Sequence, residues 1–166
     1  MILRTPWRAG RWLAFLDPAS DARGKGYQIL QSLYAVAAGG VSGTGLGSGK
    51  QKLYYLPEAH SDYIFAVIGE ELGFIGTLIV VLVFGLLMWR CLKASFNAPD
   101  RFGQLLGIGL TTMLIAQAFF NMSVVLSLVP TKGIPLPFVS AGGSSLLFAL
   151  AAIGILLNIS EQARQS

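Results

Sequence analysis

The chain has 166 residues, of which 54% are hydrophobic and only 12% are charged, and its mean hydropathy is +0.63. Soluble domains are usually about one quarter charged, so this composition excludes a soluble globular protein and indicates an integral membrane protein. The net charge of +4 would point to nucleic acid only in a soluble protein, and no nucleic-acid partner is expected here. Cys91 is the only cysteine, which excludes an internal disulfide.

At roughly 20 residues per span, the chain has room for about four membrane-spanning helices. We predict one all-α membrane domain over residues 1–166, with spans at residues 27–46, 63–89, 104–129 and 141–159 and outer loops at residues 47–62 and 130–140. With four spans, the N-terminus, the 90–101 turn and the tail share one face, which carries nine of the twelve basic residues. Basic residues favour the cytoplasmic side, so both termini are expected in the cytoplasm and both loops outside.

A glycine-rich loop follows the first predicted span, Gly43-Thr-Gly-Leu-Gly-Ser-Gly-Lys50. It does not fit a phosphate-binding loop, because Thr44 stands where the first glycine is required and Gln51 where Ser or Thr is required. The dinucleotide pattern fails as well, since Ser48 occupies a glycine position. A flexible loop that lets the backbone approach a substrate is the better interpretation.

Residues 51–65 crowd two carboxylates and the only histidine, His60, directly before a long apolar run. If a helix begins at Pro57, the carboxylates of Glu58 and Asp62 lie four residues apart on one helix face. Two interpretations stay open at this point. The carboxylates cap the positive end of the helix, or they belong to a reaction site at the bilayer surface.

Polar residues also occur inside the predicted spans. Glu70 and Glu71 lie about two turns into the second span, where acids are costly and either pair with polar groups or line a substrate path. Gln117 and Asn121 lie four apart on one face of the third span and are expected to form hydrogen bonds across helices. A stripe of small residues suited to close helix contact runs along the second span: Ala66, Gly69, Gly73 and Gly76.

The segment after the third span, Pro130-Thr-Lys-Gly-Ile-Pro-Leu-Pro-Phe138, contains three prolines and cannot be regular helix. Irregular backbone at a membrane surface is tolerated where it lines protein or a water-filled cavity. Ser140-Ala-Gly-Gly-Ser-Ser145 then opens the last span. This Gly-Ser run serves either tight helix packing or the binding of an anion by backbone N–H groups at a helix start.

Several of these motifs, in the same order, resemble the SEDS family of bacterial cell-wall polymerases, which includes FtsW, RodA and SpoVE. The likeness runs from about Trp12 to Ser160, and it is greater to the division branch (FtsW) than to the elongation branch (RodA). The family has about ten spans, so this chain resembles its C-terminal part, with Ser123 and Ser127 at positions where glycine is frequent. The matching residues are Gly43-x-Gly-Leu-Gly47, Gln51-Lys52, Leu56-Pro-Glu-Ala-His-Ser-Asp-Tyr-Ile-Phe65, Glu70-Glu-Leu-Gly-Phe74, Asn121-Met122, Pro130-Thr-Lys-Gly133 and Leu136-Pro-Phe-Val-Ser-Ala-Gly-Gly-Ser-Ser145.

The resemblance implies a peptidoglycan glycosyltransferase that polymerises lipid II at the outer face of the bacterial cytoplasmic membrane, at the division septum. It implies Asp62 as the catalytic residue. The expected partners are lipid II, membrane lipids, a class B penicillin-binding transpeptidase and the division machinery. The expected substrate-binding residues are Glu58, His60, Lys132, Ser140, Gly142, Gly143, Ser144 and Ser145.

Such a reaction needs a base that takes a proton from a sugar hydroxyl as the hydroxyl attacks an anomeric carbon carrying diphosphate. Asp62 serves either as this base or as a ligand of a divalent cation, Mg²⁺ or Mn²⁺, and the sequence does not choose between them. Lys132, with Lys50 or Lys52, is a candidate for stabilising the charge of the diphosphate.

Other functions stay open. A lipid II flippase would need a polar path, for which the candidates are Glu70, Glu71, Gln117 and Asn121. A RodA-like elongation polymerase is a variant of the first hypothesis. A fragment that keeps only partner contacts is the third, because the N-terminal half of the family is not matched, and we expect little or no activity from the isolated chain.

Overall fold

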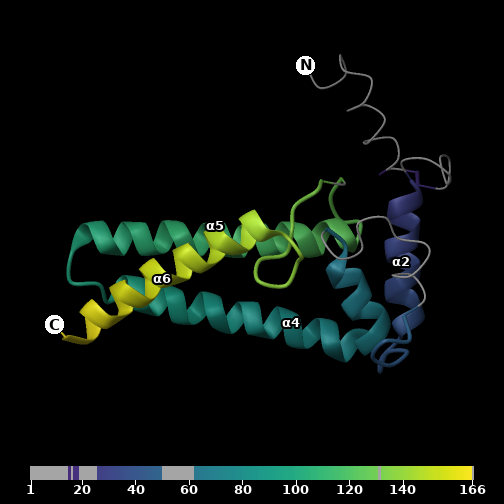
Figure 1. Cartoon of the computed structure of the whole chain (residues 1–166), viewed down its shortest axis with the longest axis horizontal. Helices are drawn as coiled ribbons and strands as arrows, with labels where there is room; N and C mark the ends of the chain where they lie inside the picture. Colours follow the sequence, from purple (N-terminus) through teal and green to yellow (C-terminus); the bar gives the residue numbers. More distant parts are fainter. Residues whose placement is uncertain (1–14, 16, 19–25, 50–61, 131, 166) are drawn as a thin grey trace, which may run out of the picture.

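The structure, a computed structural model, describes residues 15, 17, 18, 26–49, 62–130 and 132–165. Within these residues all regular structure is helical, as predicted. The helices are α2 (Tyr27–Gly39), α4 (Ile64–Phe96), α5 (Arg101–Val125) and α6 (Gly143–Gln165). The helices α4 and α5 lie side by side and antiparallel, joined by a short turn, and α6 crosses them (Figure 1).

Three helices of the described part, α4, α5 and α6, are long and apolar enough to cross a membrane. They correspond to the predicted second, third and fourth spans. The helix α4 continues to Phe96, seven residues past the predicted end of its span at residue 89. The side chain of Asp100 caps α5 by accepting a hydrogen bond from the Gly103 N–H (2.7 Å), which satisfies one of the free donors at a helix start.

The predicted first span, residues 27–46, has a different structure. The helix α2 has 13 residues and ends at Gly39, and Gly40 follows with a positive φ of 53°. Thirteen residues rise about 20 Å, short of the roughly 30 Å of a bilayer core. An uncharged, apolar stretch suggested a span, but the glycines at its end stop the helix. In Figure 1, α2 lies across one end of the α4–α5 pair instead of alongside it.

A break at Gly73 divides α4 into a short arm (residues 64–72) and a long arm (residues 74–96). Gly73 has φ 67° and ψ −160°, a conformation that is essentially confined to glycine. The break frees main-chain groups, and the loop after α2 satisfies them. Four hydrogen bonds do this: Thr44 N–H to Glu70 O (2.9 Å), Gly45 N–H to Glu71 O (3.0 Å), Phe74 N–H to Gly40 O (2.9 Å) and Ile75 N–H to Val41 O (3.2 Å).

Glycine permits this close contact of loop and helix. A Cβ at Gly43 would overlap the main chain at Glu71, and a Cβ at Gly73 would overlap the loop. The predicted small-residue stripe (Ala66, Gly69, Gly73 and Gly76) is buried, and at Gly69 it faces Val36 of α2, where a Cβ would lie 3.1 Å from Cγ2.

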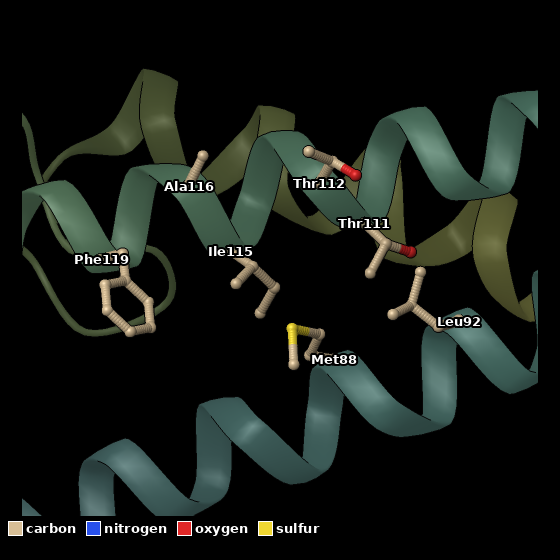
Figure 2. A pocket seen from close by; sticks show the side chains of 7 residues that line it. All are labelled: Met88, Leu92, Thr111, Thr112, Ile115, Ala116 and Phe119. Atoms are coloured by element: carbon tan, nitrogen blue, oxygen red, sulfur yellow. The ribbon is translucent and has the colours of Figure 1, made fainter.

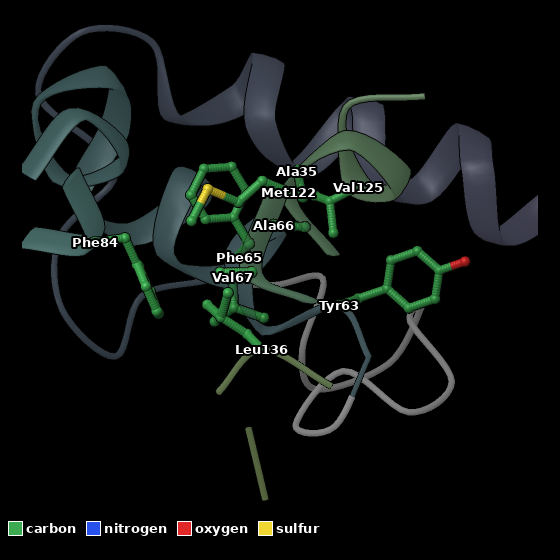
Figure 3. Packing of buried hydrophobic residues seen from close by; sticks show 10 residues of the cluster. Ala35, Tyr63, Phe65, Ala66, Val67, Phe84, Met122, Val125 and Leu136 are labelled. Atoms are coloured by element: carbon green, nitrogen blue, oxygen red, sulfur yellow. The ribbon is translucent and has the colours of Figure 1, made fainter. Parts of the chain in front are cut away.

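The main hydrophobic cluster lies at the end of the bundle where α2 and the loops meet (Figure 3). We call this the loop end, made of residues 26–49, 62–73 and 117–145; the opposite end, at residues 95–103, is the turn end. The cluster joins α2, both arms of α4, the last turns of α5 and the proline-rich segment. Its buried members are Ala35, Tyr63, Phe65, Ala66, Val67, Phe84, Ala118, Met122, Val125 and Leu136.

Candidate functional site at the loop end

Most of the site residues that the sequence predicts fall in the described part of the chain. The exceptions are Glu58 and His60, together with Lys50 and Lys52, which lie outside the described residues. Asp62 is partly buried and stands directly before Tyr63, the N-cap of α4. The helix α4 therefore begins after Asp62, at Ile64, and the expected helix start at Pro57 lies outside the described residues.

Asp62 lies against the proline-rich segment. A Cβ at Gly133 would lie 2.7 Å from Asp62 Oδ2, closer than real Cβ contacts come. A side chain at position 133 would therefore displace this carboxylate from its place. The neighbouring Lys132 is exposed. The two unusual segments of the sequence, which are 70 residues apart, thus meet at one place.

Asn121 of α5 joins these segments through hydrogen bonds. Its Nδ2 donates to the main-chain oxygen of Asp62 (2.8 Å) and to that of Ile134 (2.7 Å). The side chain is 1% exposed. Both hydrogens of one buried amide are therefore used to hold two distant chain segments together.

Gln117, one turn earlier on α5, makes the matching connection. Its Nε2 donates to Pro135 O (3.0 Å) and to Ser145 Oγ of α6 (3.3 Å). Gln117 and Asn121 thus share a helix face, as predicted. The bond to Ser145 confirms the expected contact between helices, whereas the other three bonds go to main-chain carbonyls.

The proline-rich segment is fixed further along the chain. Ser140 is buried, and its hydroxyl accepts from the Leu136 N–H (2.7 Å), while its own N–H donates to Leu136 O (3.0 Å). Residues 134–136 are thus each held by a hydrogen bond. Among the predicted site residues that follow, Gly143 and Ser144 are exposed and Gly142 and Ser145 are partly buried.

Glu70 and Glu71 lie inside α4, a candidate membrane span, as predicted. They belong to the short arm, just before the break at Gly73. Glu70 is 3% exposed. A Cβ at Gly49 would lie 2.9 Å from Glu70 Oε2 and 3.2 Å from Glu71 Oε1, so the backbone of the glycine-rich loop covers both carboxylates.

An apolar cavity of about 260 Å³ lies elsewhere, between the long arm of α4 and α5 (Figure 2). Its only polar lining comes from Thr111 and Thr112, whose hydroxyls donate to the carbonyls of Gly107 and Ile108 in their own helix. The cavity suits hydrocarbon better than a sugar or a diphosphate, so the candidate reaction site is not here. The remaining lining residues are Met88, Leu92, Ile115, Ala116 and Phe119.

The described residues contain no group of three or more His, Cys, Asp or Glu side chains that could hold a metal ion. A divalent cation beside Asp62 would need further ligands from outside this part of the chain or from the substrate. The Asp62 carboxylate beside Gly133 can accept a proton or bind a cation, and the exposed Lys132 can stabilise an anion.

Sequence reasoning identified Asp62 and the segment around Lys132 but missed the two residues that bring them together. Gly133 faces the carboxylate, and Asn121 connects the main chains. The spacing of Gln117 and Asn121 was the available signal, and it placed them on one face without naming their partners.

The fold and the site together define a multi-pass membrane protein with a polar site at one end of its helices. The profile of the FtsW, RodA and SpoVE family, described as cell cycle proteins, matches residues 1–165. The chain therefore belongs to this family.

Named relatives agree. The chain is 52% identical over 160 residues to a "probable peptidoglycan glycosyltransferase FtsW" of Trichlorobacter lovleyi, covering 96% of the chain and 42% of the relative. It is 46% identical over 164 residues to the "stage V sporulation protein E" of Bacillus subtilis, covering 99% and 45%. A solved structure described as a peptidoglycan synthase complex that coordinates polymerization and crosslinking matches with a TM-score of 0.74 at 31% identity, covering 98% and 44%. The chain thus spans less than half the length of these relatives.

Proposed function

We propose that this chain provides the outer, catalytic end of a peptidoglycan glycosyltransferase that polymerises lipid II. The observation that carries the proposal is the contact of the Asp62 carboxylate with Gly133, beside the exposed Lys132. Relatives named as glycosyltransferases support it. Because those relatives are more than twice as long, the chain is expected to need the remaining spans for full activity.

In the proposed reaction, Asp62 accepts a proton from a sugar hydroxyl while the hydroxyl oxygen attacks an anomeric carbon. The bond between that carbon and the diphosphate oxygen breaks, and the diphosphate leaves with its negative charge. The ammonium group of Lys132 offsets this charge. Glu58 and His60 remain proposed substrate ligands, with Ser140, Ser145 and the exposed start of α6 forming the wall of the site. The alternative role of Asp62, as a ligand of a Mg²⁺ or Mn²⁺ ion that would offset the diphosphate charge, stays a prediction.

The orientation we propose places the turn end in the cytoplasm and the loop end outside. The nine-to-three charge count assumed four spans, whereas the described residues offer three. Counted near the ends of these three helices, four basic residues flank the turn end and the C-terminus (Arg90, Lys93, Arg101 and Arg164), and three flank the loop end (Lys50, Lys52 and Lys132). The end of α6 is then in the cytoplasm, as predicted for the C-terminus, and the cytoplasmic location of the N-terminus stays a prediction.

We further propose that the partners are a class B penicillin-binding transpeptidase and the division machinery, and that the protein acts at the septum. The support is the similarity to a peptidoglycan synthase complex and to relatives named FtsW. The flippase alternative is less well supported, because Gln117 and Asn121 are engaged with main-chain carbonyls and do not line a path.

The test is a chimera in which this chain replaces the aligned 160-residue region of the Trichlorobacter lovleyi relative. Polymerisation of purified lipid II is measured in proteoliposomes. Asp62→Asn keeps the shape of the side chain but cannot act as a base, and we expect a loss of rate on the order of 100-fold or more.

The matched control is Asp100→Asn at the turn end. Asn caps a helix as well as Asp, so this variant should polymerise at the unmodified rate. Retention of activity by Asp62→Asn, with the chimera present in the membrane at equal amounts, would contradict the proposal.

A further inference from the structure

We propose that Asn121 is a positioning residue for the Asp62 carboxylate, a role that goes beyond holding the helices together. The inference deepens the proposed function and rests on it for the catalytic role of Asp62. It concerns how the carboxylate is aimed at the Lys132–Gly133 segment.

The hydrogen bonds of Asn121 fix the orientation of its side-chain amide. Its Nδ2 lies within 2.8 Å of two carbonyl oxygens, those of Asp62 and Ile134. A flipped amide would place Oδ1 against both of these acceptors, so the orientation is fixed by the hydrogen bonds themselves. The Oδ1 atom is buried and accepts no hydrogen bond within the described part of the chain. An isolated packing role would not require a side chain with this unmatched atom.

One of the two bonds fixes the main chain at Asp62 itself. The main-chain oxygen held by Asn121 belongs to Asp62 itself, directly before the N-cap of α4. The N–H groups of Ala66 and Val67 donate to Tyr63 O (2.9 and 3.3 Å), so the helix is fixed immediately after that residue. Both constraints act on the C-terminal side of the Asp62 Cα, where they fix the main chain that carries the carboxylate into α4.

The Asn121 amide also holds the opposite wall of the site, the turn from Lys132 to Ile134. The Ile134 N–H donates to Lys132 O (3.0 Å), while Asn121 holds Ile134 O. Gly133, whose missing side chain leaves room for the carboxylate, lies inside this short turn. The Asn121 side chain thus holds both the main chain that carries the Asp62 carboxylate and the segment that this carboxylate faces.

Gln117 provides the comparison within the same helix. It holds Pro135 O and Ser145 Oγ but makes no bond to Asp62. Removing the Gln117 amide should loosen the junction of the proline-rich segment with α6 and leave the Asp62–Gly133 contact in place. Removing the Asn121 amide should separate that contact.

The experiment uses the full 166-residue chain in lipid nanodiscs, labelled at Asp and Gly for NMR. The signal measured is the nuclear Overhauser effect between the Asp62 Hβ and Gly133 Hα protons, with the Asp62 signals assigned by their loss in Asp62→Asn. We expect Asn121→Leu, which keeps a branched side chain of similar size, to reduce this effect at least fivefold. In Gln117→Leu it should stay within about 30% of the unmodified value.

An unchanged effect in Asn121→Leu would overturn the proposal, and so would an equal loss in both variants, because general loosening would then explain it. If Asn121→Leu does not fold, the inference is tested on the unmodified chain. Its Asn121 side-chain amide protons should exchange with solvent at least 100-fold slower than those of the exposed Gln162, and should show contacts to Tyr63 and Pro135. Fast exchange or missing contacts would overturn the inference. Polymerisation by the Asp62→Asn chimera would instead contradict the proposed function. It would not change the NMR result, which tests only the position of Asn121.

Discussion

The two ends of the helix bundle use hydrogen bonds in opposite ways. At the turn end and along the adjacent half of α5, polar side chains bond within three or four residues of their own position, as Ser95 does to Cys91 O (2.7 Å) and Thr111 to Gly107 O (2.7 Å). At the loop end, several polar side chains donate hydrogen bonds to residues that are far away in the sequence. Ser32 of α2 donates to Val125 O (3.2 Å), 93 residues away, and Asn121 donates to Asp62 O, 59 residues away.

The difference separates two sources of structure. Local bonds form whenever the helix forms, so the turn end needs little from the rest of the chain. The long-range bonds form only when several segments have already come together, and losing one leaves a buried partner unsatisfied. Substitutions that remove a long-range bond at the loop end should therefore cost more stability and should disturb the site, whereas those that remove a local bond at the turn end should cost less and leave the site unchanged.

The largest effect is expected for Gly73→Ala. The conformation at this position is essentially confined to glycine, and a Cβ would overlap the loop that satisfies the broken helix. The chain should lose at least about 3 kcal/mol of unfolding free energy, measured by denaturation in detergent. Gly85→Ala, in the same helix with open space around it, is the control and should be neutral or slightly stabilising. Equal effects of the two substitutions would show that the break at Gly73 is not formed.

Asn121→Leu should follow, with a loss of about 2–4 kcal/mol, because two main-chain carbonyls lose the donor that joins their segments. Thr112→Val is the control for the same helix, since this exposed hydroxyl bonds only to Ile108 O and its removal should change stability by less than about 0.5 kcal/mol. The same denaturation measurement applies. Similar losses for both would remove the distinction between the two ends.

Asp100→Ala tests the turn end, where the carboxylate caps α5 through the Gly103 N–H. Removal of the cap should cost about 1 kcal/mol. Asp100→Asn should restore most of it, because an amide oxygen accepts the same hydrogen bond. In the chimera, lipid II polymerisation should not change with Asp100→Ala, and a loss of rate would show that the turn end is coupled to the site.

The smallest effect, opposite in sign, is expected for Ser127→Gly. Ser127 follows the end of α5 with a φ of 55°, and the hydrogen bonds around it are those of a helix end that favours glycine: Ser127 N–H to Val124 O (3.0 Å) and Leu128 N–H to Ser123 O (2.8 Å). Glycine should stabilise the chain by about 0.5–1 kcal/mol in the same measurement. A destabilised variant would show that the serine side chain has a role of its own.

The sequence allowed part of this fold to be predicted because part of it is local. Hydropathy and length identified the three long helices, and the small-residue stripe was correctly assigned to a contact surface. The short helix α2 was mistaken for a span, since residues 27–46 are apolar and uncharged and nothing but glycines marks its end. The break at Gly73 was missed for a related reason: the same glycine pattern that indicates helix packing also permits an interruption.

The candidate site was predicted less completely. The proline-rich segment and Asp62 stand out by composition, so both could be named, and the resemblance assigned them a role. Their contact depends on Asn121, whose two acceptors are main-chain oxygens. Main-chain atoms are the same in every residue, so no pattern of residue types reveals which carbonyls an amide will find.

The interruption of α4 has a consequence for how this protein can vary. The four hydrogen bonds at Gly73 are made by main-chain atoms of residues 40–45, so they do not depend on most side chains there. Substitutions outside the tightly packed glycines should be tolerated in this loop. An inserted or deleted residue would shift two pairs of bonds out of alignment at once. We therefore expect the loop of residues 40–45 to have the same length in related proteins even where its amino acids differ.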